Sequence, residues 1–253
     1  MGHLLVIAHR GDSAHRPENT LASFAGALEV GAQLVELDVQ LSGDGHVIVL
    51  HDPTLDRTTT GRGDVRRMTL ADIRALSAGY PDRFGSAYAG ERVPTLAEAL
   101  ALLRGRAGIL VELKTESVTD DAEGGIEARV VHEVRRAGMV GEAALITFDH
   151  RAALRLKVLA PEITRGRLFG RTTSDEVLAH ARDAGCELVM PHKSQLDDAL
   201  AERVHAAGLK LATWVVDEPA ELKRLARFGL YGVGSNCPGV LLEAIADGLL
   251  DTP

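Results

Sequence analysis

Short apolar runs rich in β-branched residues alternate along the chain with longer segments of helical periodicity. The expected strands are residues 4–8, 34–39, 109–113, 144–148, 164–169, 187–190, 210–215 and 231–235. Helical patterns lie between and after them, at residues 20–30, 95–104, 123–137, 150–159, 174–184, 196–207, 219–228 and 239–248. Strands that alternate with helices in this way are typical of parallel βαβ units. Eight strands and eight helices predict an α/β fold of the (β/α)8 TIM-barrel type.

The connection after the second strand is longer than the others, and we expect a small insertion there, at about residues 40–94. Within it, residues 42–45 indicate a turn, 46–50 an additional strand folding back, 69–75 a short helix and 78–90 a loop. The insertion would lie on the rim at the carboxyl ends of the strands, where barrel active sites are built. Nothing divides the chain further, so residues 1–253 are predicted to form a single domain.

Composition narrows the class of protein. Hydrophobic residues make up 45% of the 253 residues and charged residues 25%, an ordinary globular mixture that excludes a disordered chain. No apolar run approaches the length of a membrane span, so we expect no integral membrane segment. The formal charge of −8 argues against a nucleic-acid partner. The start of the chain has no signal-peptide pattern, and the two cysteines form no disulfide framework, so a cytoplasmic location is the expectation.

Three carboxylates stand at the ends of two expected strands. Residues two apart in a strand share a face, so Glu36 and Asp38 project together while Leu37 points the other way. Glu112 and Lys114 repeat that spacing on the next barrel strand. Three acids on neighbouring strands suit a hard divalent cation, Mg²⁺ or Ca²⁺. The alternative for each pair is a structural ion pair without a metal.

Two histidines are expected near the same rim. His9, with Arg10 and Gly11, ends the first strand, and His51 follows the additional strand of the insertion. Histidine moves protons near neutral pH, and arginine can bind an anion. Taken alone each histidine could be structural, but together with the acids they suit phosphoryl transfer, with the histidines as base and acid.

Several motifs, taken in order, resemble the glycerophosphodiester phosphodiesterase family. They are residues 9–11 (HRG), 17–20 (PENT), 36–39 (ELDV), 51–59 (HDPTLDRTT), 61–63 (GRG), 93–96 (VPTL) and 112–114 (ELK). The resemblance is dense over residues 5–114 and thinner to the end, where Trp214 resembles a tryptophan of the family's seventh strand. The family fold is a TIM barrel with an insertion after strand two, in agreement with the pattern above.

The resemblance implies a role for each matching residue. His9 and His51 would be the general base and acid, and Glu36, Asp38 and Glu112 would hold the metal. Arg10 and Lys114 would contact the phosphate, and Trp214 would line the substrate pocket unless it is a core aromatic. The implied reaction is metal-dependent hydrolysis of glycerophosphodiesters, which are small molecules, to sn-glycerol 3-phosphate and an alcohol.

Other residues near these motifs are expected to be structural. Asn19 or Thr20 would cap the first helix, and Glu18 would brace the loop bearing Arg10. Ser235 and Asn236 replace the Thr-Asp often seen in the family, and we expect neither to touch the catalytic residues.

Two alternative functions remain open at this level. One is a lysophospholipase D-like activity on longer-chain lipids, suggested by the aromatic residues Tyr80, Phe84 and Tyr88 in the insertion. The other is a barrel that binds a phosphodiester without turnover.

Overall fold

A computed structural model describes residues 4–251, so the outermost residues of the predicted domain lie outside the described part. The strands are β1 Leu5–His9, β2 Leu34–Leu41, β3 Val47–Val49, β4 Gly108–Leu113, β5 Ala143–Thr147, β6 Thr164–Phe169, β7 Leu188–Pro191, β8 Lys210–Thr213 and β9 Gly232–Ser235. All except β3 are parallel to their neighbours, in the order β1-β9-β8-β7-β6-β5-β4-β2, and the pairing of β1 with β2 closes the ring. The predicted (β/α)8 barrel is therefore confirmed.

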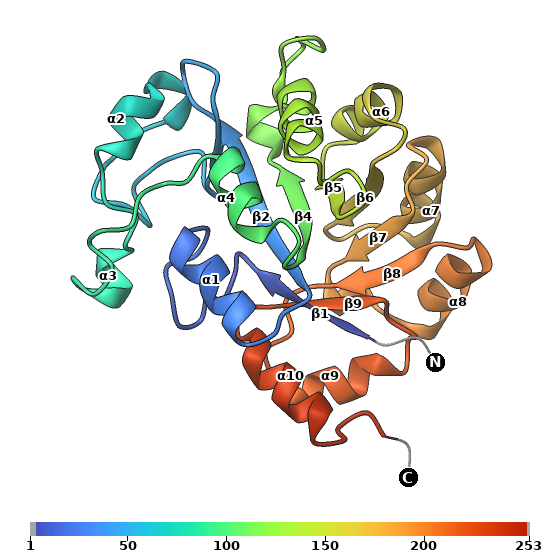
Figure 1. Ribbon diagram of the computed structural model, residues 1–253. Coiled ribbons are helices and arrows are strands. Elements are labelled where there is room, and N and C mark those ends of the chain that lie inside the picture. Colours follow the sequence, from blue (N-terminus) through green and yellow to red (C-terminus); the bar gives the residue numbers. More distant parts are fainter. Residues whose placement is uncertain (1–3, 252–253) are drawn as a thin grey trace.

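Helices surround this barrel on the outside (Figure 1). They are α1 Leu21–Glu29, α2 Leu70–Arg74, α3 Pro81–Phe84, α4 Leu96–Leu103, α5 Ile126–Ala137, α6 His150–Leu159, α7 Ser174–Asp183, α8 Asp198–Ala206, α9 Pro219–Ala226 and α10 Pro238–Ala246. Short 3-10 turns occur at Val65–Arg67, Thr115–Ser117 and Lys193–Gln195. Over residues 4–251, we find no helix with both the length and the apolar character that crossing a bilayer requires.

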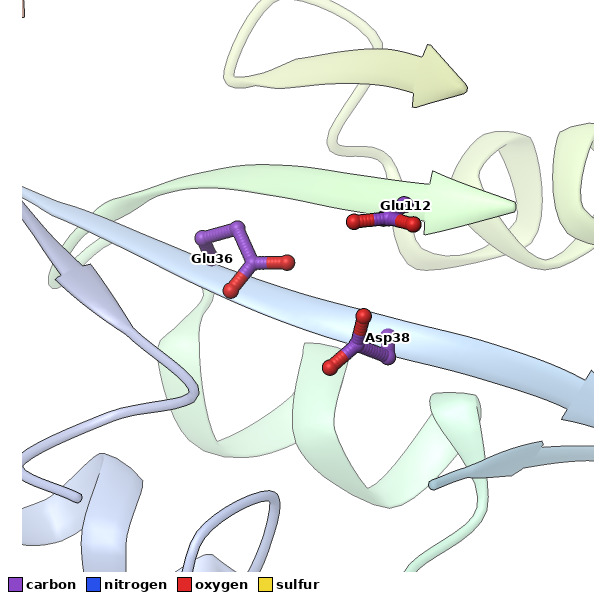
Figure 2. Close-up of side chains that lie close together, drawn as sticks. All are labelled: Glu36, Asp38 and Glu112. Atoms are coloured by element: carbon purple, nitrogen blue, oxygen red, sulfur yellow. The ribbon is translucent and has the colours of Figure 1, made fainter. Parts of the chain in front are cut away.

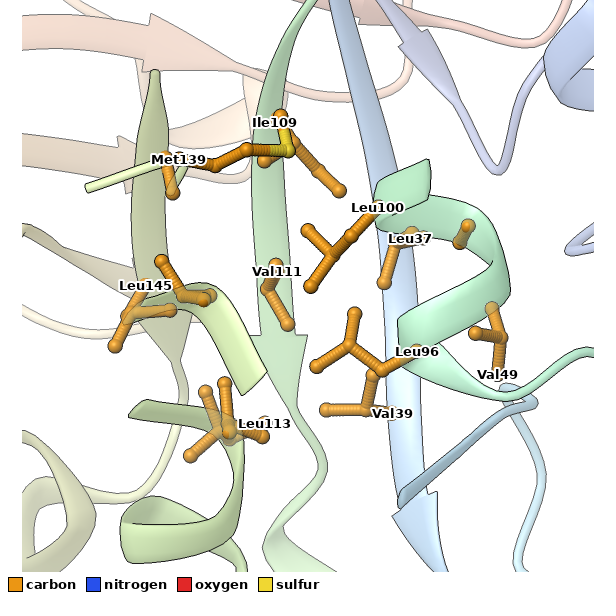
Figure 3. Close-up of a cluster of buried hydrophobic side chains, with 14 of the residues drawn as sticks. Leu37, Val39, Val49, Leu96, Leu100, Ile109, Val111, Leu113, Met139 and Leu145 are labelled. Carbon is orange, nitrogen blue, oxygen red and sulfur yellow. The ribbon is translucent and has the colours of Figure 1, made fainter. Parts of the chain in front are cut away.

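The apolar core lies mainly between the strands and the surrounding helices. Leu37 of β2 and Leu100 of α4 are both fully buried in this layer, which Figure 3 shows between β2, β4 and α4. A smaller apolar cluster, including Ile7, Ile146 and Leu188, fills the barrel interior. Because Leu37 faces the helices, its neighbours Glu36 and Asp38 face the barrel interior, as the period of the strand predicts.

The insertion after β2 is a small subdomain with its own apolar core. Ile48, Leu55 and Ile73 are fully buried in it, and β3 pairs antiparallel with the end of β2. The predicted extra strand and short helix are therefore confirmed as β3 and α2. The prediction of a loop over residues 78–90 was wrong in part: α3 forms one helical turn there, started by Pro81 at its first position. Figure 1 shows α2 and α3 to one side of the barrel, beyond α1 and α4.

Candidate active site

Three carboxylates converge inside the barrel mouth. Asp38 of β2 lies opposite Glu112 of β4 in the parallel register, and Glu36 is two residues before Asp38 on the same face. One oxygen from each carboxylate lies within 4.8 Å of the others, and all three residues are buried. Figure 2 shows the three groups directed toward one another from the two strands. The predicted convergence of the acids is confirmed.

Two cations lie against this cluster. Lys114 Nζ donates to Glu112 Oε1 at 2.7 Å and lies 3.4 Å from Asp38 Oδ1. The guanidinium Nε of Arg10 lies 3.1 Å from Asp38 Oδ2, and the backbone N–H of Arg10 donates to Glu36 Oε2 at 3.0 Å. Both cations line the same cavity as Glu36 and Glu112, which is where a phosphate contact would require them.

Burial and mutual repulsion separate the acids by their pKa values. Burial, together with the nearby Asp38 and Glu112 carboxylates, raises the pKa of Glu36 well above its usual value. Burial and Asp38 raise the pKa of Glu112 from 4.5 to about 7. Burial acts in the same direction on Asp38, but Arg10 and Lys114 outweigh it and hold the pKa of Asp38 well below its usual range. The same burial and repulsion oppose full ionisation of the three acids, which a bound cation would favour.

The donor set fits a hard divalent cation. Among the described residues, Glu36 Oε1 and Asp38 Oδ1 are buried and have no hydrogen-bond partner, although buried carboxylate oxygens are normally satisfied. Carboxylate oxygens are the ligands that Mg²⁺ and Ca²⁺ prefer. Unpartnered oxygens from two acids, directed at a third, form the arrangement that such an ion would complete.

His9 is held by Asn236, which directly follows β9, the strand next to β1. The ring atom Nδ1 of His9 and Oδ1 of Asn236 are 2.8 Å apart. Desolvation and the adjacent Arg10 lower the pKa of His9 from 6.5 to about 4, so the ring is neutral near pH 7. The expectation that Asn236 does not touch the catalytic residues was wrong, because the closed barrel places the end of β9 beside the end of β1.

His51 is held by a chain of charges that ends at Arg10. Nδ1 of His51 lies 2.7 Å from Asp52 Oδ1, and Arg57 Nε donates to Asp52 Oδ2 at 2.7 Å. Arg57 also donates twice to Glu18, at 2.7 and 2.8 Å, and Glu18 accepts from Arg10 at 2.8 Å. Burial by itself would raise the pKa of Asp52. Hydrogen bonds with Arg57 and His51 outweigh burial and hold this pKa below its usual value. The predicted bracing of Arg10 by Glu18 is confirmed, and it extends to the insertion.

Asn19 and Thr20 follow Glu18, and the sequence left open which of them caps the first helix. Thr20 caps α1 in a capping box with Ser23. Asn19 instead holds Asp38: its Nδ2 donates to Asp38 Oδ2 at 2.8 Å, and its Oδ1 accepts from the backbone N–H of Asp38 at 3.2 Å. One oxygen of Asp38 is thereby fixed while Oδ1 is left toward the other acids.

These groups surround a cavity of about 110 Å³. His9, His51 and the acids Glu36 and Glu112 line it together with Arg10 and Lys114, and Trp214 lies among the apolar residues of its wall. The indole of Trp214 packs edge-on against Phe148, with ring centroids 5.7 Å apart, and donates to the carbonyl of Met190 at 3.1 Å. The cavity thus has a charged side and an apolar side.

Sequence reasoning missed the residues that hold the reactive groups. Asn19, Asp52, Arg57, Asp217 and Asn236 each contact a candidate site residue or its partner, but none of them lines the cavity. Asp52 and Arg57 were within motifs already quoted, so the repeated charges of residues 51–59 were an available signal. No sequence signal pointed to Asp217, because its role depends on which loops meet at the barrel mouth.

Comparison with known proteins assigns the class. Residues 9–240 match the model of the glycerophosphoryl diester phosphodiesterase family. The chain is 35% identical, over 96% of its length and 98% of the relative's, to a glycerophosphodiester phosphodiesterase of Caldanaerobacter subterraneus subsp. tengcongensis. A phosphodiesterase of Oleispira antarctica, solved in complex with its product sn-glycerol-3-phosphate, is 32% identical, with a TM-score of 0.88 over 96% of both chains. A glycerophosphodiester phosphodiesterase of Agrobacterium tumefaciens is 30% identical, with a TM-score of 0.81 over 95% of this chain and all of the other.

The fold and these relatives define a phosphoric diester hydrolase built on a TIM barrel. More particularly, the chain belongs to the glycerophosphoryl diester phosphodiesterase family.

Proposed function

We propose that this enzyme hydrolyses glycerophosphodiesters to sn-glycerol 3-phosphate and an alcohol, with one divalent cation held by Glu36, Asp38 and Glu112. The observation that carries the proposal is the convergence of these acids within 4.8 Å in a cavity that both His9 and His51 line. The solved relative from Oleispira antarctica, whose product is sn-glycerol-3-phosphate, supports the choice of substrate class.

The charges at the site support the same reading. When all three carboxylates are ionised, as metal ligands must be, they outnumber the cations Arg10 and Lys114, and the excess negative charge would repel a phosphodiester anion. A divalent cation on the carboxylates would reverse that sign, and when bound it would also stabilise charge on the phosphoryl oxygens. Arg10 and Lys114 would then bind the remaining phosphate oxygens, because both line the cavity.

The partners of the two histidines favour different proton-transfer roles. With Nδ1 of His9 engaged by the neutral amide of Asn236, its Nε2 would accept a proton from the attacking oxygen, of water or of the neighbouring glycerol hydroxyl. His51 contacts the Asp52 carboxylate through Nδ1, which orients the ring, and its Nε2 would donate a proton to the departing alkoxide. The phosphorus–oxygen bond to the alcohol breaks as that proton arrives.

The lysophospholipase D-like alternative rests on aromatic residues of the insertion. Tyr80, Phe84 and Tyr88 pack edge-to-face, with ring centroids 6.3 and 5.5 Å apart, and are half-buried in the insertion. Their remaining exposed apolar area would favour a substrate carrying an acyl chain. We therefore include a lysophospholipid beside water-soluble diesters in the test below.

The test is product release before and after chelation. The enzyme should liberate sn-glycerol 3-phosphate from glycerophosphocholine, lose that activity in EDTA and regain it with Mg²⁺ or Ca²⁺. Full activity after exhaustive chelation would contradict the metal assignment. Turnover of lysophospholipid with none on glycerophosphocholine would favour the alternative activity.

A further inference from the structure

The loop after β8 and the end of β9 form a connected polar structure beside His9. Asp217 Oδ1 accepts from the backbone N–H of Asn236 at 2.7 Å and from Ser235 Oγ at 3.1 Å. Its second oxygen, Oδ2, accepts from Asn236 Nδ2 at 2.9 Å. Asp217 thus holds both the backbone and the side chain of Asn236. The remaining side-chain atom of that amide, Oδ1, is directed at the ring of His9.

The hydrogen bonds with Asp217 determine the orientation of the side-chain amide of Asn236. An ionised carboxylate only accepts hydrogen bonds, so the atom of Asn236 next to Asp217 Oδ2 has to be the NH₂ group. The atom facing Nδ1 of His9 is then the carbonyl oxygen, which only accepts. The Ser13 hydroxyl also lies 3.1 Å from Asn236 Oδ1, but its hydrogen can be donated to the His9 carbonyl oxygen at 2.8 Å, so this contact is compatible with either orientation. Nδ1 of His9 therefore has to carry the hydrogen.

We propose that Asn236, oriented by Asp217, is a positioning residue that fixes His9 as the Nδ1–H tautomer and leaves Nε2 with the free lone pair. The inference rests on the proposed function, in which Nε2 of His9 removes the proton from the attacking oxygen. It extends that function to two residues outside the predicted site. A carboxylate in the place of the Asn236 amide would also accept from Nδ1 of His9, but it would place a negative charge beside the ring. The neutral amide sets the tautomer without that charge.

The tautomer can be measured without turnover. In protein labelled with ¹⁵N-histidine, the His9 signals are those absent from the H9Q variant. In the metal-free wild-type protein, Nδ1 should show the shift of a protonated ring nitrogen and Nε2 that of an unprotonated one. An Nε2–H tautomer of His9 in the wild type would overturn the proposal whatever the enzyme's activity.

Substitution of Asp217 and of Asn236, first singly and then together, gives the sharper test. In D217N two NH₂ groups would meet unless the amide of Asn236 turns over, and that turn would present an N–H to His9. D217N should therefore move His9 toward the Nε2–H tautomer and lower kcat roughly 10- to 100-fold, with KM within about twofold. N236D should also lose activity, because it sets two carboxylates 2.9 Å apart.

The double variant D217N/N236D restores a donor facing an acceptor, and it should regain the Nδ1–H tautomer and most of the lost kcat. The matched control is D12N, which removes a carboxylate in the loop after β1 that contacts His15 at 2.9 Å and makes no hydrogen bond to the His9 ring. Its kcat and its His9 signals should match the wild type, and unfolding temperatures should confirm that all variants fold.

Two kinetic outcomes would also overturn the proposal. One is a D217N variant with wild-type kcat, and the other is a double variant no better than its worse parent while still folded. The proposed function fails by a different result. If H9A keeps full activity, His9 is not the base, yet the ring shifts still report whether Asp217 and Asn236 set its tautomer.

Discussion

Binding of the metal should release protons from the acid cluster, and the apparent affinity should rise with pH. A carboxylate must be ionised to bind a cation, and the pKa of Glu112 is raised to about 7 by burial and by Asp38. Near pH 6 Glu112 would be mostly protonated, and near pH 8 mostly ionised. Linkage then gives about a tenfold gain in apparent affinity from about pH 6 to pH 8 for Glu112 alone. Glu36, whose pKa is raised well above its usual value, adds to this gain.

Titration calorimetry measures both quantities. Mg²⁺ is titrated into chelator-treated enzyme near pH 6 and pH 8, in buffers of different ionisation enthalpy, so that the buffer dependence counts the protons released. E112Q should weaken binding and release fewer protons. E116Q, which removes an exposed carboxylate four residues along the chain, should behave as wild type. Equal affinity at both pH values with no proton release would refute the reasoning about the cluster.

Three further outcomes test the rest of the site. H9A and H51A should each lower kcat roughly 10²–10⁴-fold on glycerophosphocholine, and only H51A should be largely rescued on a nitrophenyl ester, because nitrophenolate departs without a proton. Equal rescue of both would contradict the base and acid assignment. G11A should lower activity and thermal stability, because Gly11 has a φ of +84° and an added Cβ would lie 2.6 Å from the backbone carbon of Ser23. T20V removes the oxygen that caps α1 and should cost about 1 kcal/mol in free energy of unfolding, measured by urea denaturation, with wild-type KM as its control.

The fold followed from the sequence because each of its elements has a local signature. Strand and helix patterns repeat along the chain, and right-handed βαβ connections leave few ways to arrange them. The acid cluster followed for the same reason, since Glu36 and Asp38 share a face by the period of a strand and β4 lies next to β2. The expected strand ends placed His9 and His51 near the same rim, where the structure has them lining one cavity.

Only the tertiary structure determined the contacts that orient the carboxylates and histidines and shift their pKa values. Asn19 looked like a helix cap, but the loop between β1 and α1 carries it to Asp38. Asn236 looked like a neutral replacement, but closure of the barrel brings residues 227 positions apart within hydrogen-bonding distance. The shifts in pKa likewise depend on burial and on neighbouring charges, which no spacing along the chain specifies. The sequence alone determined which reactive groups face the barrel mouth, because strand periodicity is local. Only the packed loops decided how their protons are held, because those contacts form between distant segments.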